Sequence, residues 1–166
     1  MAAPVRVTGR GAAEEEIVRG MSEHATEKTT IAGDAAAIRA VLLDFARYPE
    51  WVRDLKEVEV LGTDEQGRAS AVRFRAAAMG RSTSYTLEYD YPSDEVIAWT
   101  LVEGDIMRTL DGQYTLTPSG PSTHVDYELE IDLKLPLPGF VKRRSQGRIM
   151  HAALRDLKDR VESGAA

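Results

Sequence analysis

The chain of 166 residues has the length of one globular domain, and its 43% hydrophobic and 29% charged residues argue against a disordered or fibrous protein. Its net charge of -6 opposes attraction to phosphate backbones, so we expect no nucleic-acid partner. The lack of cysteine excludes disulfides, thiolate zinc sites and cysteine nucleophiles.

The N-terminal part combines Gly, Ala and Arg with a run of three glutamates and shows little apolar periodicity. We therefore predict a flexible leader over residues 1–24 and a single domain over 25–163. The N-terminus lacks the apolar core of a secretory signal, and no run of about 18 apolar residues could span a bilayer. We expect a cytoplasmic protein without stable membrane insertion. No pattern indicates an oligomeric state.

The domain is predicted to open with a strand over residues 26–32 and a helix capped by Asp34. Apolar residues recur in that helix at helical spacing, at Ile38, Val41, Leu42 and Phe45. Proline suits the first turn of a helix and disfavours helix at the residue before it, so Pro49 indicates a second, short helix over 49–52.

Clusters of Gly, Pro, Asp and Ser then divide extended segments into a series of hairpins. The clearest strand is 123–134, where apolar residues alternate with acidic ones, and strand 82–91 has a strongly aromatic side. By this alternation the acidic residues of 126–132, like Glu57 and Glu59, face water, so we predict no metal site. A last helix over 140–161 is expected to cover the apolar face of the sheet with one stripe, made of Phe140, Met150, Ala153, Leu154, Leu157 and Val161.

Four segments stand out in this order of elements: 45–52 (FARYPEWV), 58–61 (VEVL), 111–118 (DGQYTLTP) and 135–138 (LPLP). Together they resemble the polyketide cyclase/dehydrase family of the START-like (SRPBCC) superfamily, and the likeness covers residues 26–161. The resemblance implies an α+β helix-grip fold. In that fold a curved antiparallel sheet of about seven strands wraps around a long C-terminal helix, two short helices follow the first strand, and a cavity lies between sheet and helix.

Small residues leave room for such a cavity. Ala76, Ala77 and Ala78 stand where a strand would normally carry bulky side chains, and Gly147 falls close to the apolar stripe of the last helix. The alternative is that neighbouring aromatic residues fill this space. We favour the cavity because of the family resemblance, and predict that its ligand contacts are Trp51, Phe74, Tyr85, Tyr89, Trp99, Met107, Arg108, Tyr114, Tyr127, Gly147 and Met150.

Charged and catalytic candidates are fewer. Arg108 shares strand parity with Leu110 and so points into a concave face, but pairing in solvent with Glu103 or Asp105 is the favoured alternative. His151 is the one histidine with a path to the cavity, and helix geometry can instead turn it to solvent. No catalytic residue is assigned, and no cofactor is expected. The basic cluster of the last helix is interpreted as a solvated face, and its members are Lys142, Arg143, Arg144 and Arg148.

The sequence thus predicts a domain that encloses a hydrophobic small molecule, lipid-, quinone- or polyketide-like, as a carrier or sequestering protein. The family resemblance leaves two alternatives open. One is a polyketide aromatase/cyclase that holds a folded poly-ketone chain while Tyr or Arg groups polarise a carbonyl. The other is a ribosome- or protein-interacting role, which the acidic balance weakens.

Overall fold

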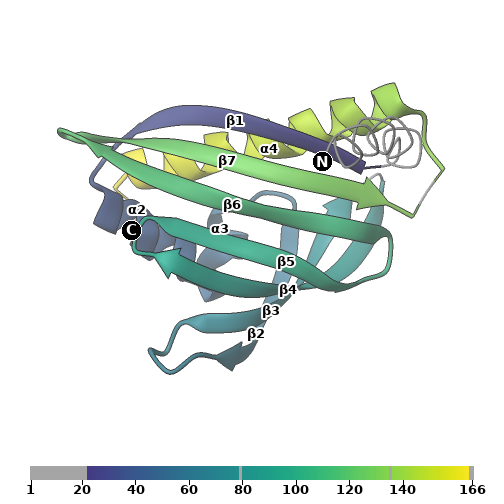
Figure 1. The fold of residues 1–166 in the computed structure, drawn as a ribbon, viewed down its shortest axis with the longest axis horizontal. Coiled ribbons are helices and arrows are strands. Elements are labelled where there is room, and N and C mark those ends of the chain that lie inside the picture. The colour runs from purple at the N-terminus through teal and green to yellow at the C-terminus, as the bar shows by residue number, and fades with distance from the viewer. Residues whose placement is uncertain (1–21, 79, 135, 165–166) are drawn as a thin grey trace, which may run out of the picture.

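One antiparallel sheet of seven strands organises the chain, with the helices on its concave side (Figure 1). The computed structural model describes residues 22–164, apart from positions 79 and 135. The elements in chain order are β1 (Ser22–Ala32), α2 (Ala35–Leu43), the 3-10 helix η2 (Phe45–Arg47), α3 (Tyr48–Trp51), β2 (Leu55–Thr63), β3 (Ala69–Ala78), β4 (Arg81–Ser93), β5 (Val96–Gly104), β6 (Met107–Ser119), β7 (Ser122–Leu133) and α4 (Gly139–Glu162). The strand order is β1-β7-β6-β5-β4-β3-β2. Strands β2 to β7 therefore form a meander, and β1 pairs with β7 at the end of the sheet. The predicted helix-grip fold is confirmed.

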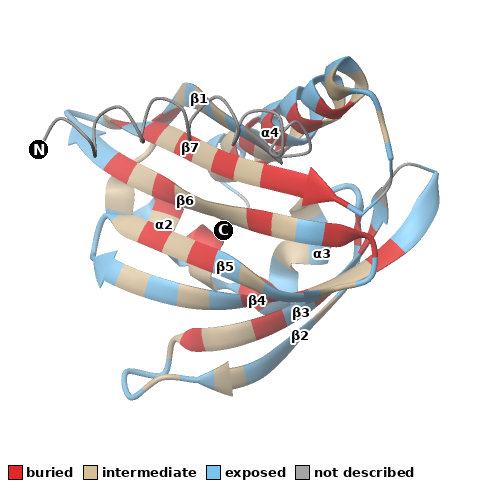
Figure 2. Cartoon of the chain, turned by 45° about the vertical axis from the view of Figure 1, so that its right-hand side comes forward, coloured by how far each residue is buried: buried red, intermediate tan, exposed pale blue. Residues whose placement is uncertain are grey.

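Alternation of apolar and polar residues gives the sheet one buried face (Figure 2). In β7 every second residue from Thr123 to Leu133 is buried, as the pattern predicts. One acidic residue departs from it: Asp132 was expected to face water but is buried. It is covered because two cations close over it, Arg108 from β6 and Lys142 from α4.

The two short helices follow the predicted local rules. The Asp34 side chain accepts a hydrogen bond from the backbone N–H of Ala37 at 2.7 Å, so it caps α2, whose buried residues are Ile38, Val41 and Leu42. Pro49 lies in the first turn of α3. Both helices contact α4 near its C-terminal end, where Arg160 forms an ion pair with Glu50 at 2.9 Å.

The long helix α4 buries two stripes. Met150, Leu154 and Leu157 are buried, and the helix packs chiefly on β1 and β7. A second stripe, which includes Ile149 and Ala152, faces the middle of the sheet. Phe140 was predicted to join the apolar stripe but is 58% exposed, since it lies at the solvent side of the first turn.

The N-terminal boundary lies earlier than predicted. Strand β1 begins at Ser22, paired with Asp132 of β7, so residues 22–24 belong to the strand and not to a leader. This happens because β7 continues far enough to offer these residues a hydrogen-bonding partner strand. The rest of the predicted leader, residues 1–21, lies outside the described residues.

Candidate ligand-binding cavity

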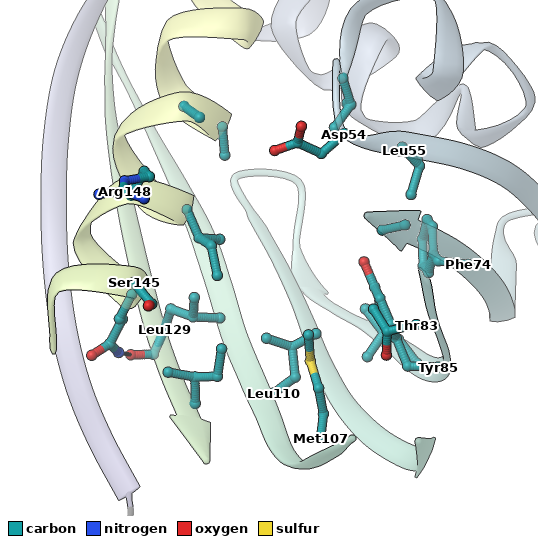
Figure 3. A pocket seen from close by; sticks show the side chains of 18 of the residues that line it. Asp54, Leu55, Phe74, Thr83, Tyr85, Met107, Leu110, Leu129, Ser145 and Arg148 are labelled. Atoms are coloured by element: carbon teal, nitrogen blue, oxygen red, sulfur yellow. Dashed lines mark hydrogen bonds between the residues drawn. The ribbon is translucent and has the colours of Figure 1, made fainter. Parts of the chain in front are cut away.

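A cavity of about 540 Å³ lies between the concave face of the sheet and α4 (Figure 3). This volume is within the range of about 300 to 1,000 Å³ that is typical of small-molecule sites. Ala76 and Ala77 are among its walls, where larger side chains would have filled the space. Eight of the predicted contact residues also line it: Trp51, Phe74, Tyr85, Tyr89, Trp99, Met107, Tyr114 and Tyr127.

Aromatic rings in contact with one another form much of the wall. The Trp99 ring lies 5.4 Å from Tyr114 and 5.9 Å from Tyr127, and these two tyrosines stack on each other at 4.7 Å. Gly112 permits this arrangement, because a Cβ at that position would lie 2.8 Å from the Trp99 indole and clash with the Glu128 carbonyl. The lack of a side chain in β6 therefore seats the indole against the sheet.

A second aromatic group lines the cavity on β3 and β4 and under α3. Phe74 and Tyr85 stack with ring centroids 5.4 Å apart, and Tyr48 lies 5.0 Å from Trp51. Such pairs favour a fixed mutual orientation, so these walls are preformed and do not have to be ordered by a ligand.

Four tyrosine hydroxyls in the cavity have no hydrogen-bond partner in the part of the chain that the structure describes. Among the described residues, no hydrogen bond forms to the hydroxyl of Tyr85, Tyr89, Tyr114 or Tyr127, and none of the four oxygens is sealed from a water-sized molecule. By contrast, Tyr48 donates to the Leu42 carbonyl. The unpartnered hydroxyls are donors available to a molecule inside the cavity.

Removal from bulk water keeps these phenols neutral. Burial raises the pKa of Tyr85 to about 12, and burial also raises the pKa of Tyr89, Tyr114 and Tyr127 above the usual tyrosine range. Neighbouring tyrosines raise the pKa of the last three further. At neutral pH the groups therefore act as hydrogen-bond donors and not as phenolate bases.

A buried cation lies in the wall near the start of α4. Lys142, only 3% exposed, was interpreted as part of a solvated face, but its Nζ lies 3.7 Å from an oxygen of Asp132 and the residue lines the cavity. Arg108 binds the other Asp132 oxygen at 2.9 Å. Next along the helix, the Gln146 amide donates to the Leu129 carbonyl at 2.9 Å.

Two carboxylates also lie at the cavity, Asp156 farther along α4 and Asp54 just before β2. Asp156, 4% exposed, accepts from the backbone N–H of Arg53 and forms ion pairs at 3.5 Å with the side chains of Arg53 and Arg155. Asp54 also lines the cavity, and its carboxylate points toward α4 (Figure 3). The side chain of Asp54 makes no hydrogen bond or ion pair with another described residue.

The cavity opens to solvent beside α4. The exposed residues among those that line it mark the opening, and they are Asp54, Ala77, Gly80, Arg148 and Ile149. They come from the start of β2, the β3–β4 hairpin and α4, so the opening lies between this hairpin and the helix.

Sheet, helix and cavity can be compared with known proteins. A family model described as polyketide cyclase/dehydrase and lipid transport matches residues 22–162, from the first strand to the end of the last helix. The chain belongs to this family. The START-like resemblance seen in the sequence is thereby confirmed. Comparison with curated proteins gave no match.

Several solved structures share the family's fold. A START superfamily protein from Mycobacterium smegmatis is 27% identical, covers 84% of this chain and 97% of its own, and superposes with a TM-score of 0.81. The Zhui aromatase/cyclase from Streptomyces sp. R1128 is 17% identical, with coverages of 87% and 96% and a TM-score of 0.76. A STAR-related lipid transfer protein fragment from Xanthomonas axonopodis is 16% identical, with coverages of 84% and 85% and a TM-score of 0.65. The last two likenesses establish the fold and no activity.

Three residues predicted to face the family's cavity do not line it. Arg108 is half exposed and pairs with Asp132, and not with Glu103 or Asp105. The register of β6 shifts between Met107 and Thr109, and this bulge breaks the strand parity on which its inward orientation rested. Gly147 lies on the opposite side of α4 from Ile149 and is exposed. Met150 is buried in the stripe that α4 shares with Leu154.

The histidines of the described chain also lie outside the cavity. His151 is 71% exposed and faces Glu27 at 3.7 Å, so helix geometry turns it to solvent. His124 pairs with the Thr30 hydroxyl, and His24 lies in β1 near Glu128. Within residues 22–164, leaving aside 79 and 135, no group of acidic and histidine side chains is placed to hold a metal. In the same residues, no helix is long and apolar enough to cross a membrane.

Sequence reasoning missed the polar part of the wall. Lys142, Gln146 and Asp156 recur at helical spacing on one side of α4, and this spacing was the available signal. Thr83 was also missed: it is buried in β4, and its hydroxyl donates to Asp105, an interaction that lowers the pKa of that carboxyl. This bond ties β4 to the turn before β6.

Proposed function

We propose that the protein binds a hydrophobic, ring-containing or lipid-like molecule in its cavity, as a carrier or sequestering protein. The observation that supports this most directly is the set of four tyrosine hydroxyls, inside an aromatic cavity of about 540 Å³, that have no hydrogen-bond partner among the described residues. Apolar surface transferred from water to such walls gains about 25 cal/mol per Å². Carbonyl or hydroxyl oxygens of the molecule accept hydrogen bonds from the tyrosines.

The family description and one relative support the same class of cargo. The family model is described as including lipid transport, and the Xanthomonas relative is named as a lipid transfer protein. Quinone-like and polyketide-like molecules have the same combination of apolar surface and carbonyl oxygens, so they fall within the proposed class.

Uptake of an apolar fluorescent probe tests the proposal, together with native mass spectrometry of the purified protein. Ala152→Phe should lower probe affinity because Ala152 lines the cavity on α4. Ala40→Phe adds the same ring at an exposed position of α2 and serves as the control. Equal probe binding by both folded variants and the unsubstituted protein would place binding elsewhere and refute the proposal.

A second candidate is a polyketide aromatase/cyclase, and Asp54 is the observation that favours it. Its carboxylate lies at the cavity with no partner among the described residues, so it can act as a base, while neutral Tyr85 can donate to a carbonyl of the substrate. The likeness to the Zhui aromatase/cyclase agrees with this chemistry.

Incubation with poly-ketone substrates separates the two candidates. A cyclase should form a product that is absent without protein, and Asp54→Asn and Tyr85→Phe should each slow its formation by roughly ten- to a thousand-fold. A carrier should retain the molecule unchanged, and the same substitutions should alter only its dissociation constant.

A further inference from the structure

Charge is divided unevenly between the start of α4 and the rest of the chain. Residues 134–155 contain six Lys and Arg residues and no Asp or Glu, a net charge of +6. The whole chain carries -6, so the remainder carries -12. Lys142 and Arg155 are paired with Asp132 and Asp156. The positive field outside the helix therefore comes chiefly from exposed arginines such as Arg144 and Arg148, and it reaches about 10 Å at moderate salt.

Part of this charge lies on an outward-facing strip of the helix. Phe140, Arg144 and Arg148 are four residues apart and therefore share one side of α4, and all three are exposed. We call these three residues the basic face. Phe140 is 58% exposed, which places one large apolar side chain in line with the arginines.

The arginines of the basic face differ from those of the sheet. Arg73 and Arg75 each bind a carboxylate of the neighbouring strand, at 3.0 and 2.7 Å from Glu59 and Glu57. Within the part of the chain that the structure describes, no carboxylate lies within 4.0 Å of Arg144 or Arg148. Their charge is thus available to an external anion instead of being cancelled locally.

The basic face adjoins the opening of the cavity. Arg148 belongs both to this face and to the rim, where Ile149 follows it opposite Ala77 and Gly80 of the β3–β4 hairpin. Anything bound to the face would therefore lie next to the route by which a molecule enters or leaves.

We propose that the basic face docks on the surface of an anionic membrane. Arginines attract acidic headgroups, while Phe140 can enter the boundary between headgroups and acyl chains. An acidic protein would satisfy the arginines too, but a membrane also accounts for the exposed Phe140 side chain and for the position of Arg148 at the opening of a cavity lined by apolar residues. The docking is peripheral and needs no membrane-spanning helix.

Vesicle flotation tests this surface independently of any cavity ligand. The protein should float with phosphatidylcholine vesicles that contain phosphatidylglycerol and remain in solution with phosphatidylcholine alone. Arg144→Glu should weaken binding roughly 25-fold, because each basic residue near an anionic surface contributes about a fivefold factor and the substitution changes two charges. Phe140→Ser should weaken it as well, and added salt should reduce binding.

Lys28→Glu is the matched control, since it makes the same change of charge at an exposed position of β1. It should leave flotation close to that of the unsubstituted protein. If Lys28→Glu and Arg144→Glu weaken vesicle binding equally, the effect depends on total charge alone and the proposal is overturned. Failure to float with anionic vesicles, or capture of an acidic protein through Arg144 without vesicle binding, would overturn it also. Probe uptake by Arg144→Glu in solution shows separately whether the cavity still binds.

Discussion

Two buried regions meet along α4, and they are built in opposite ways. Toward β1 and β7 the helix presents Met150, Leu154 and Leu157, which are at most 3% exposed and fill the space. Toward the middle of the sheet it presents small and polar residues such as Ser145, Ala152 and Asp156, and the cavity remains. One helix therefore supplies a packed core for stability and an open wall for binding.

The two regions should differ most in their contribution to stability at alkaline pH, because the buried tyrosine hydroxyls lie on the cavity side. Burial raises the pKa of Tyr85 to about 12 and the pKa of Tyr89 and Tyr127 above the ordinary value of about 10. The contribution of these groups to stability is therefore complete below about pH 10, and that of Tyr85 is lost as pH rises through about 12. We expect the melting temperature to fall steeply over that interval. A scan of melting temperature against pH measures this, and Tyr85→Phe should make the fall less steep. A melting temperature that does not change over this interval would mean that the tyrosine hydroxyls ionise as readily in the folded state as in the unfolded state.

Truncation on the packed side should cost far more than truncation on the cavity side. Leu157→Ala removes a fully buried side chain and should lower the free energy of unfolding by about 3 kcal/mol. Ile149→Ala removes a partly exposed one at the cavity rim and should cost about 1 kcal/mol or less. Chemical denaturation of the two variants measures both values. Similar losses would show that the cavity side is packed as tightly as the core.

Two tyrosine substitutions should differ in stability by a smaller amount. Tyr48→Phe removes a hydrogen bond to the Leu42 carbonyl and should cost about 1 kcal/mol of stability. Tyr127→Phe removes a hydroxyl that has no partner among the described residues, so its stability should change by less than about 0.5 kcal/mol. Denaturation curves give the stabilities. Ligand affinity should respond in the reverse order, and a large stability loss in Tyr127→Phe would reveal a structural role for its hydroxyl.

The smallest expected effect is at the outward side of the helix. Gly147→Ala should stabilise the protein by about 0.5 to 1 kcal/mol, because Ala is the better helix former and a Cβ there meets no atom within 4 Å. Probe uptake should not change, since the residue lies away from the cavity. A weaker probe affinity would show that Gly147 lines the cavity, as the sequence predicts.

Local rules predicted most of the fold. The alternation in β7, the Asp34 cap and the turn at Pro49 each depend on neighbours close in sequence, and all three are confirmed. The aromatic wall was also predictable, because strand parity is preserved from Tyr85 to Tyr89 and the same rule places Tyr114 and Tyr127 on the buried face.

The polar wall was not predictable in the same way, because it depends on contacts between distant segments. A bulge in β6 moved Arg108 out of the expected parity, and no residue type marks that bulge in the sequence. Lys142 carries a charge that normally lies in water, yet it is buried because Asp132 approaches it from β7. Gly147 was placed wrongly because nearness to an apolar stripe leaves the side of the helix undetermined.

The position of β1 has a consequence for how the chain is synthesised. Ser22 pairs with Asp132 although more than 100 residues separate them, and the far end of β1 is held by Lys158, which donates to the Thr30 carbonyl, and by Glu162, which accepts from Ala32. Within this domain β1 is synthesised before β7 and α4, so it cannot find its partners until they have been made. During that delay the aromatic face of the meander lacks its cover, and we expect this interval to be the one in which the chain is most prone to aggregate.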